Sequence, residues 1–498
     1  MKRPSHARIV ERIRNPWYGA LLTCLLAIQA GCLPLPSDSP PSNNPPQRAE
    51  PARRVTDTRP SLASYADREL PVADPALSLA GRVDFDSSEL TSEQRVWYER
   101  LWSAVDASLD DMVAMMHQDD AYDVGRWAFQ FNHALLTGLR TTGDLHFLDA
   151  VDAVAEAIRA QLDDRWCGGV ARTVSLGDRY GEVEERDGFV NLRFRHQGGI
   201  HYCRDTSDLH EALAHGHLAL LMYAYHVNRD NPSPSGIDYG ERADFWLDYL
   251  RNHFEPKWRE RSGVAWPDMD FIDLKFCHTY HQMLLLYTFV GWRLADEGSA
   301  EAEPYLHQAL RLTDSMFEVP YDRNRRQPGG FIAVETPLGD AVVYSFGAPG
   351  GTAVADTHLE ACPLTYARYM LTSVLNLYLE GLQRWDDDIM ERLGHGLAYF
   401  AMDTDPVTGR SAPFAAGVSG DGGVSDLTPT EYRSRVSLGR FNMTPFAAFA
   451  AWDTSGTVQR ISLAAYEAWE DDPEAPLEVH VPAAFLLTVT LEGDVELQ

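Results

Sequence analysis

Cysteine is scarce in this chain, and its copies lie far apart. Six of the 498 residues are cysteine. The spacing shows no CxxC pair, so it does not indicate a zinc ribbon, and any disulfide pairing stays open. We therefore expect no metal and no cofactor. The cysteines that follow Cys32 are Cys167, Cys203, Cys277 and Cys362.

Positive charge is also scarce. Lysine and arginine number 43 against 73 aspartate and glutamate residues, which gives a formal net charge of −30 at pH 7. Because polyanions are repelled at long range by such a surface, we expect no nucleic-acid partner and no charge-driven binding to an anionic membrane. The acidity is typical of a surface adapted for solubility or salt.

The apolar run near the N-terminus is too short to cross a membrane. It covers residues 18–30, follows a segment that contains Lys2 and Arg3, and falls short of the ~20 residues that a spanning helix needs. A basic start, an apolar middle and small residues at the end are typical of a secretory signal. We therefore expect an exported protein.

This run ends in Gln29-Ala30-Gly31-Cys32. The segment resembles the lipobox of bacterial lipoproteins, which implies that Cys32 becomes the acylated first residue of the mature chain. Gln29 stands where a lipobox usually has leucine, so secretion without a lipid stays the alternative. The resemblance implies a protein of the bacterial cell envelope, which would touch the outer membrane only through its lipid anchor, or else a periplasmic or secreted one.

Composition also sets the expected domain boundaries. Residues 1–31 form the signal peptide, and residues 32–65 are rich in proline, serine and asparagine. Such a segment cannot bury a core and is predicted to be a tether. Residues 66–471 form one catalytic domain, and residues 472–498 form a tail with a candidate edge strand.

The catalytic domain is predicted to be all-α. Apolar positions three and four apart recur in long segments that polar turns separate, which is the helical period. At one of these turns Gly143 ends a helix and Asp144 begins the next. The predicted helices are 97–116, 127–140, 145–162, 210–228, 239–254, 279–295, 301–317, 365–382 and 386–400, with a last pair at 445–452 and 457–469.

Two insertions, 170–203 and 330–346, interrupt the helices. In the second, short alternating runs flank the hairpin turn Pro337-Leu338-Gly339-Asp340. The insertions precede helices that begin with histidine and could wall a cleft, while ordinary surface hairpins are the alternative. Helical hairpins of unequal length favour an (α/α) toroid with small β-hairpin insertions over a solenoid, whose repeats are more regular.

Histidines stand at or just before the starts of four apolar, helix-like runs, which are 134–139, 218–225, 283–290 and 364–377. If these helices form the inner ring of a toroid and run in one direction, their starts meet at one mouth and build one polar pocket. Trp127 and Trp266 could stack on sugar rings there, with core packing as the alternative. The residues at the four starts are Asn132, His133, His210, Glu211, His278, Tyr280, His281 and His358.

Two short segments resemble the helical-toroid polysaccharide lyases that act on alginate and related uronates. They contain Asn132-His133 and then Arg195 and Tyr202. The resemblance implies β-elimination, in which donors such as Asn132 and Arg195 neutralise the uronate carboxylate so that the C5 proton becomes acidic. His133 and Tyr202 would share the roles of base and acid, and the reaction needs no metal.

The same residues have structural explanations as well. A histidine on an apolar helix face, such as His133, is typical of a packed core. Asp208 with Glu211, and Thr357 with Glu360, have the spacing of a capping box, so both glutamates are predicted to cap helix starts.

We therefore predict an exported lyase of uronate-containing polysaccharide. A glycoside hydrolase on the same toroid, with carboxylates drawn from residues 208, 211, 268, 270 and 356, is one alternative. A non-catalytic glycan-binding lipoprotein is another. Because the chain is acidic, a polyanionic substrate requires cations that face the same cleft as His133. The candidates are Arg126, Arg193, Arg195, Arg204, Lys275, Arg323, Arg325, Arg326 and Arg368.

Overall fold

The computed structural model describes a little under half of the chain. The described residues are 79–118, 129–163, 190–192, 208–257, 277–318, 331–336, 338–344, 352–353, 360–361, 364–380, 382, 385–398, 449, 452–453, 455–456 and 458. The predicted signal peptide, tether and C-terminal tail lie outside these residues, as does nearly all of the predicted helix pair at 445–469.

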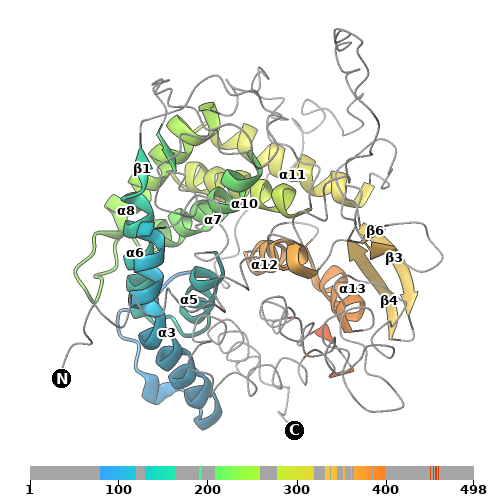
Figure 1. The fold of residues 1–498 in the computed structure, drawn as a ribbon, viewed down its shortest axis with the longest axis horizontal. Coiled ribbons are helices and arrows are strands. Elements are labelled where there is room, and N and C mark those ends of the chain that lie inside the picture. The colour runs from blue at the N-terminus through green and yellow to red at the C-terminus, as the bar shows by residue number, and fades with distance from the viewer. Residues whose placement is uncertain are drawn as a thin grey trace, which may run out of the picture. The chain divides into compact units, whose positions relative to one another are not determined.

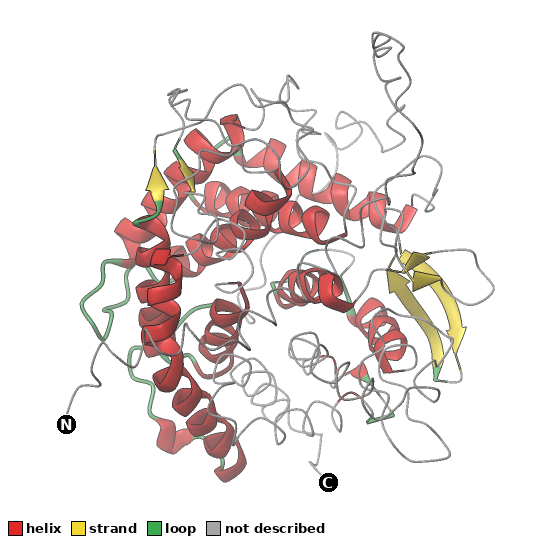
Figure 2. Cartoon of the chain, viewed as in Figure 1, coloured by secondary structure: helices red, strands yellow, loops and turns green. Residues whose placement is uncertain are grey.

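The described part is mostly helical (Figure 2), which confirms the all-α prediction. Each predicted helix between residues 97 and 400 is present, with ends that differ by a few residues. A short 3-10 helix, η3 (Ser87–Glu89), precedes the first long helix. The α-helices are α3 (Ser92–Gln118), α5 (Phe129–Thr142), α6 (Leu145–Arg159), α7 (Asp208–Val227), α8 (Tyr239–Tyr249), α10 (Cys277–Asp296), α11 (Ala302–Glu318), α12 (Leu364–Leu379) and α13 (Asp387–Gly396), and the π-helical turn η5 (Leu250–Phe254) continues α8.

The turn between α5 and α6 has the predicted chemistry. Gly143 has a φ of +77°, which favours glycine. Asp144 is the N-cap of α6, and its carboxylate accepts a hydrogen bond from the backbone N–H of His146. Asp238 and Asp386 cap α8 and α13 in the same way. These caps satisfy N–H groups that have no partner within the helix.

The predicted β-hairpin is also confirmed. Strands β3 (Phe331–Thr336) and β4 (Gly339–Tyr344) pair antiparallel, with Thr336 opposite Gly339 at the turn. Two smaller pairs join β1 (Leu162–Asp163) to β2 (Asn191–Leu192), and β5 (Thr352–Ala353) to β6 (Glu360–Ala361).

Two boundary predictions are wrong because of these short strand pairs. Leu162 was expected to end a helix, but α6 stops at Arg159 and Leu162 pairs with Leu192. Glu360 was expected to cap a helix, but it lies in β6, and α12 begins only at Leu364. In both cases cross-strand pairing overrides the helix signal, with a partner 30 residues away for Leu162 and seven residues away for Glu360.

Four helices contact each other in order and form an inner row (Figure 1). They are α5, α7, α10 and α12. Helices α7 and α10 run parallel, since Gly216 lies against Gln282, and two turns further on the ring of Tyr223 lies 5.5 Å from that of Phe289.

Helices α5 and α12 are likewise parallel, because the residues that contact each other follow in the same order along both helices. His133 meets Asn376, and further along each helix Arg140 meets Glu380. The four helices therefore place their first turns toward one end and their last turns toward the other.

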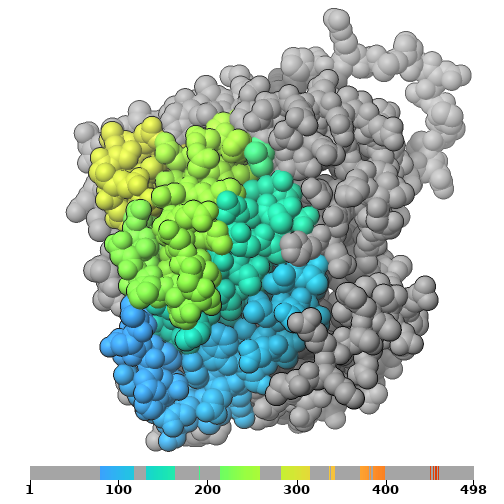
Figure 3. Space-filling model, turned by 90° about the vertical axis from the view of Figure 1, so that its left-hand side faces the viewer, coloured from blue at the N-terminus to red at the C-terminus, as the bar shows by residue number. Residues whose placement is uncertain are grey.

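Each of the first three inner helices is backed by the helix that follows it in sequence. The rings of Tyr225 and Tyr239 join α7 to α8, and those of Tyr287 and Tyr305 join α10 to α11. Phe147 of α6 packs against Gly138 of α5. Each of these three helices therefore packs against its successor in the sequence. On the face drawn in Figure 3, the surfaces of α3 (blue), α6 (teal) and α8 (green) adjoin.

The segment that precedes η3 lies against the last turns of the inner helices. Asn228, just after α7, donates to the carbonyl of Leu79 and accepts from the N–H of Gly81. The N–H of Arg82 donates to the carbonyl of Gly143, just after α5. Residues 79–82 therefore join the C-terminal ends of α5 and α7.

Gly216→Ala tests the parallel contact of α7 and α10. A Cβ atom at Gly216 would lie 2.2 Å from the carbonyl oxygen of Gln282, so the two helices would have to separate. We expect a loss of about 1–3 kcal/mol in the free energy of unfolding, measured in urea. Gly240→Ala, where the nearest atom is 3.2 Å away, is the matched control. A Gly216→Ala variant as stable as that control would contradict the close contact.

Candidate functional site

The inner helices enclose a group of buried polar side chains, which we call the interior polar cluster. One or two members come from each inner helix, and each is at most 2% exposed. Burial of so many polar groups between helices is costly unless they pair with each other or serve a ligand. The members are His133 of α5, His217 of α7, Gln282 of α10, and Ser373 and Asn376 of α12.

Hydrogen bonds connect the cluster across the helices. Asn376 Nδ2 lies 3.1 Å from His133 Nδ1 and donates over 2.7 Å to the carbonyl of Thr372, one turn earlier on α12. Gln282 Nε2 lies 2.9 Å from Ser373 Oγ and so joins α10 to α12. The cluster therefore fixes the positions of the inner helices relative to one another.

The two histidines of the cluster lie face to face at a tilt. The ring centroids of His133 and His217 are 5.1 Å apart, with 49° between the ring planes. Burial lowers the pKa of His133 well below its ordinary value, and the proximity of the second imidazole, His217, and of the positive charge on Arg140 lowers it further. Burial also lowers the pKa of His217, to about 3. Both imidazoles are therefore neutral at neutral pH.

A buried ion pair lies one turn beyond the cluster. Arg140 at the end of α5 contacts Glu380, just after α12, over 2.6 Å, and the two side chains are 8% and 0% exposed. Removal of one partner from such a pair typically costs about 3–5 kcal/mol, because the other charge stays buried. The pair holds the last turns of α5 and α12 together, and the positive charge of Arg140 is one of the causes that lower the pKa of His133.

Asn132 lies next to His133 in the first turns of α5 and is fully buried. Neither its amide oxygen nor its amide nitrogen has a hydrogen-bond partner within the described part of the chain. A buried amide without partners typically costs about 1–3 kcal/mol. Such a side chain is a candidate for contact with a ligand.

The structure places some of the predicted site residues and not others. Asn132 and His133 lie on α5, and His133 is buried between helices rather than at an open mouth. His210 and Glu211 lie in the first turn of α7, and His278, Tyr280 and His281 lie in the first turns of α10, although their side chains are outside the described structure. The residues outside the described part are Arg195, Tyr202, His358, Trp127, Trp266 and Cys32.

Sequence reasoning missed the partners of His133. It selected His210 on α7, whereas the histidine that meets His133 is His217, two turns further along the same helix. Asn376 was also missed, although a polar residue inside the apolar stretch 371–379 is a detectable signal. The cations expected around His133 are all outside the described structure, including the side chain of Arg368 on α12.

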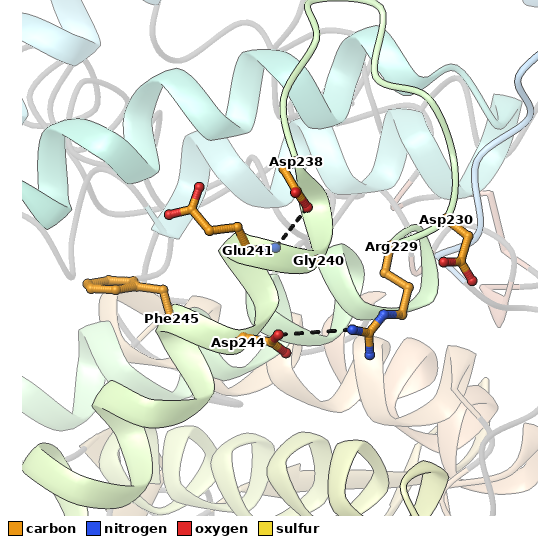
Figure 4. A pocket seen from close by; sticks show the side chains of 7 residues that line it. All are labelled: Arg229, Asp230, Asp238, Gly240, Glu241, Asp244 and Phe245. Atoms are coloured by element: carbon orange, nitrogen blue, oxygen red, sulfur yellow. Dashed lines mark hydrogen bonds and ion pairs between the residues drawn. The ribbon is translucent and has the colours of Figure 1, made fainter.

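An open pocket of about 590 Å³ lies at the start of α8 (Figure 4). Arg229 and Asp244 face each other across it at 4.0 Å, and Asp238 accepts a hydrogen bond from the N–H of Glu241. None of the predicted site residues lines this pocket. The lining residues are Arg229, Asp230, Asp238, Gly240, Glu241, Asp244 and Phe245.

Two searches of the described residues gave no result. No group of three or more histidine, cysteine, aspartate or glutamate residues among them is arranged to hold a metal ion. No helix in the same residues combines the length and apolar character that a membrane span requires.

Comparison with known proteins gives no relative for this chain. No protein-family model, no curated protein and no solved structure matches it.

The stability of the protein should fall in acid because of the buried histidines. The unfolded chain takes up protons near pH 6.5, whereas folded His217 stays neutral down to about pH 3. Stability is therefore complete above pH 6.5 and declines below it by about 1.4 kcal/mol per pH unit for each such group. We expect His217→Gln to reduce this slope, as measured by urea unfolding between pH 7 and pH 5. Ser373→Ala removes a buried group that does not titrate and should keep the slope; equal slopes in all three proteins would contradict the burial of neutral His217.

Proposed function

We propose that the chain is an exported polysaccharide lyase that cleaves uronate-containing chains by β-elimination on an (α/α) toroid. The observation that carries this proposal is the contact of His133 with His217 and Asn376 between parallel inner helices. It supports a reactive centre built from side chains that are far apart in the sequence. The substrate class comes from the resemblance of Asn132-His133, Arg195 and Tyr202 to the lyases that act on alginate.

The order of helix contacts supports the toroid. Helices α5, α7, α10 and α12 touch in sequence, each of the first three is backed by its following helix, and α12 in turn contacts α5. His133 lies in the second turn of α5, and His210 and His278 lie in the first turns of α7 and α10; these turns lie toward the same end of the inner helices. In the proposed toroid this end is the substrate mouth.

The cluster's chemistry suits a uronate. Elimination requires donors that neutralise the carboxylate, and such donors act most strongly where water is excluded. Buried Asn132 and the neutral imidazole of His133 are donors of this kind. Among the described members of the cluster there is no carboxylate, and the described Glu380 is paired with Arg140.

A product assay on the purified chain tests the proposal. We expect one acidic polymer among alginate, glucuronan and heparin-like chains to yield unsaturated, ultraviolet-absorbing ends. His133→Ala and Tyr202→Phe should each lower kcat/KM by at least about 100-fold. The matched control is His146→Ala on α6, whose side chain is 65% exposed. Circular dichroism of each variant checks that its fold is intact.

Other products would overturn the proposal. Saturated products would identify a hydrolase, and unchanged polymer after long incubation would indicate a glycan-binding protein. Full activity in both His133→Ala and Tyr202→Phe would remove these residues from the reaction.

We also propose that Cys32 carries the lipid that holds the protein at the bacterial outer membrane. The support is the resemblance of Ala30-Gly31-Cys32 to a lipobox, together with the proline-rich segment that follows. In a bacterial host grown with labelled fatty acid, we expect label in the wild-type chain and none in Cys32→Ser. Cys24→Ser is the matched control and should keep the label. Equal labelling of Cys32→Ser and the wild type would refute the anchor.

A further inference from the structure

We infer that Asn376 is a positioning residue, which fixes neutral His133 as the tautomer with its proton on Nε2. His133 then acts as a neutral hydrogen-bond donor and not as the base. The tautomer stands on the structure alone, whereas its role in catalysis rests on the proposed function.

The orientation of the Asn376 amide follows from its own helix. Its Nδ2 atom lies 2.7 Å from the carbonyl oxygen of Thr372, which can only accept a hydrogen bond. The reversed amide would place two oxygens at that distance. The amino group therefore points toward Thr372, and its second hydrogen is available to His133.

The tautomer of His133 follows from the amide. Asn376 Nδ2 lies 3.1 Å from His133 Nδ1, and a donor at that distance requires a lone pair on Nδ1. A neutral imidazole has one N–H and one lone pair, so its proton is on Nε2. A second proton would set two N–H donors against each other.

The surroundings of His133 hold this state. The ring is 2% exposed, so water does not compete for Nδ1. The charged or titratable groups that act on it are His217 of α7 and Arg140 of its own helix, and both disfavour a positive imidazolium. Asn376 is itself fixed, because Ser373 on the same helix is joined to Gln282 of α10.

The tautomer of His133 determines which role this residue can have in the proposed elimination. The Nε2–H group can donate to a uronate carboxylate or to the enolate that forms from it, and His133 loses and gains no proton. Neither ring nitrogen can take the C5 proton, because Nε2 is protonated and the Nδ1 lone pair accepts from Asn376. The base is therefore another group, and His133 provides electrostatic stabilisation.

Nitrogen NMR on the full chain tests the tautomer without any substrate. In protein labelled with ¹⁵N-histidine, the His133 signals are assigned as those missing from His133→Gln. We expect Nδ1 to give the signal of an unprotonated nitrogen and Nε2 that of a protonated one in neutral buffer. A proton on Nδ1, or an even mixture of tautomers, would overturn the inference.

Asn376→Asp tests whether Asn376 sets this state. Its carboxylate accepts a hydrogen bond, so the His133 proton should move to Nδ1 or the ring should become positively charged, with its pKa raised by about one unit or more. Tyr378→Phe, on the same helix, removes a hydroxyl that donates to Asp387 and not to the cluster, so it is the matched control and should leave the His133 signals unchanged. If Asn376→Asp does not fold, Asn376→Leu replaces it, and the Nδ1 signal should then shift to that of an unprotonated nitrogen that accepts no hydrogen bond. His133 signals that are unchanged in the folded variant would refute a positioning role.

Kinetics separate this inference from the proposed function. A wrong histidine tautomer can lower kcat by up to about 10⁴-fold, and we expect Asn376→Asp to lower kcat at least about 100-fold with little change in KM. If no polymer is cleaved, the proposed function fails while the tautomer is still read from the NMR spectrum. A variant with the changed tautomer and full kcat would refute the catalytic role alone.

Discussion

The close approach of α7 and α10 is the constraint on which the rest of the interior depends. Gly216 has no side chain, so the backbone of Gln282 can come within the space that a Cβ would fill. Gln282 then reaches Ser373 on α12, and α12 carries Asn376 to His133 on α5. A wider spacing of α7 and α10 would move Gln282 away from Ser373 and would leave several polar groups buried without partners. The geometry around His133 is thus set by a glycine on another helix.

A polar interior lowers the stability of the fold. Its presence therefore favours a role for these side chains in binding a ligand. Apolar side chains of similar volume at positions 133, 217, 282 and 376 would pack between the same helices with no loss of hydration. Instead the chain buries two neutral histidines and leaves both amide atoms of Asn132 without a described partner. A purely structural core would not favour these residues. They are favoured in a site that must donate hydrogen bonds to a ligand where water is excluded.

The fold was largely predictable because its signals are local. Helical periodicity, the Gly143-Asp144 turn and the alternating runs around Pro337 each act within a few residues. Leu162 was misplaced because its strand partner, Leu192, lies 30 residues further on, and Glu360 because a short pairing with Ala353 competes with the capping pattern. The site was predictable only in part for the same reason. Asn132 and His133 stand out at a helix start, but the choice of His217 over His210 depends on how far α7 is shifted along α5, which no short segment encodes.

The two ends of the inner helices differ in how open they leave the path of a ligand to the interior polar cluster. Residues 79–82 bind to Asn228 and Gly143, so the chain itself occupies the C-terminal ends of α7 and α5. The open pocket at Arg229 lies at that end as well, and a rise of 1.5 Å per residue places it about 18 Å along the axis of α7 from His217. That pocket is therefore separate from the interior polar cluster. Among the described elements, the first turns of α5, α7 and α10 lie at the opposite end, and histidines gather there in the sequence.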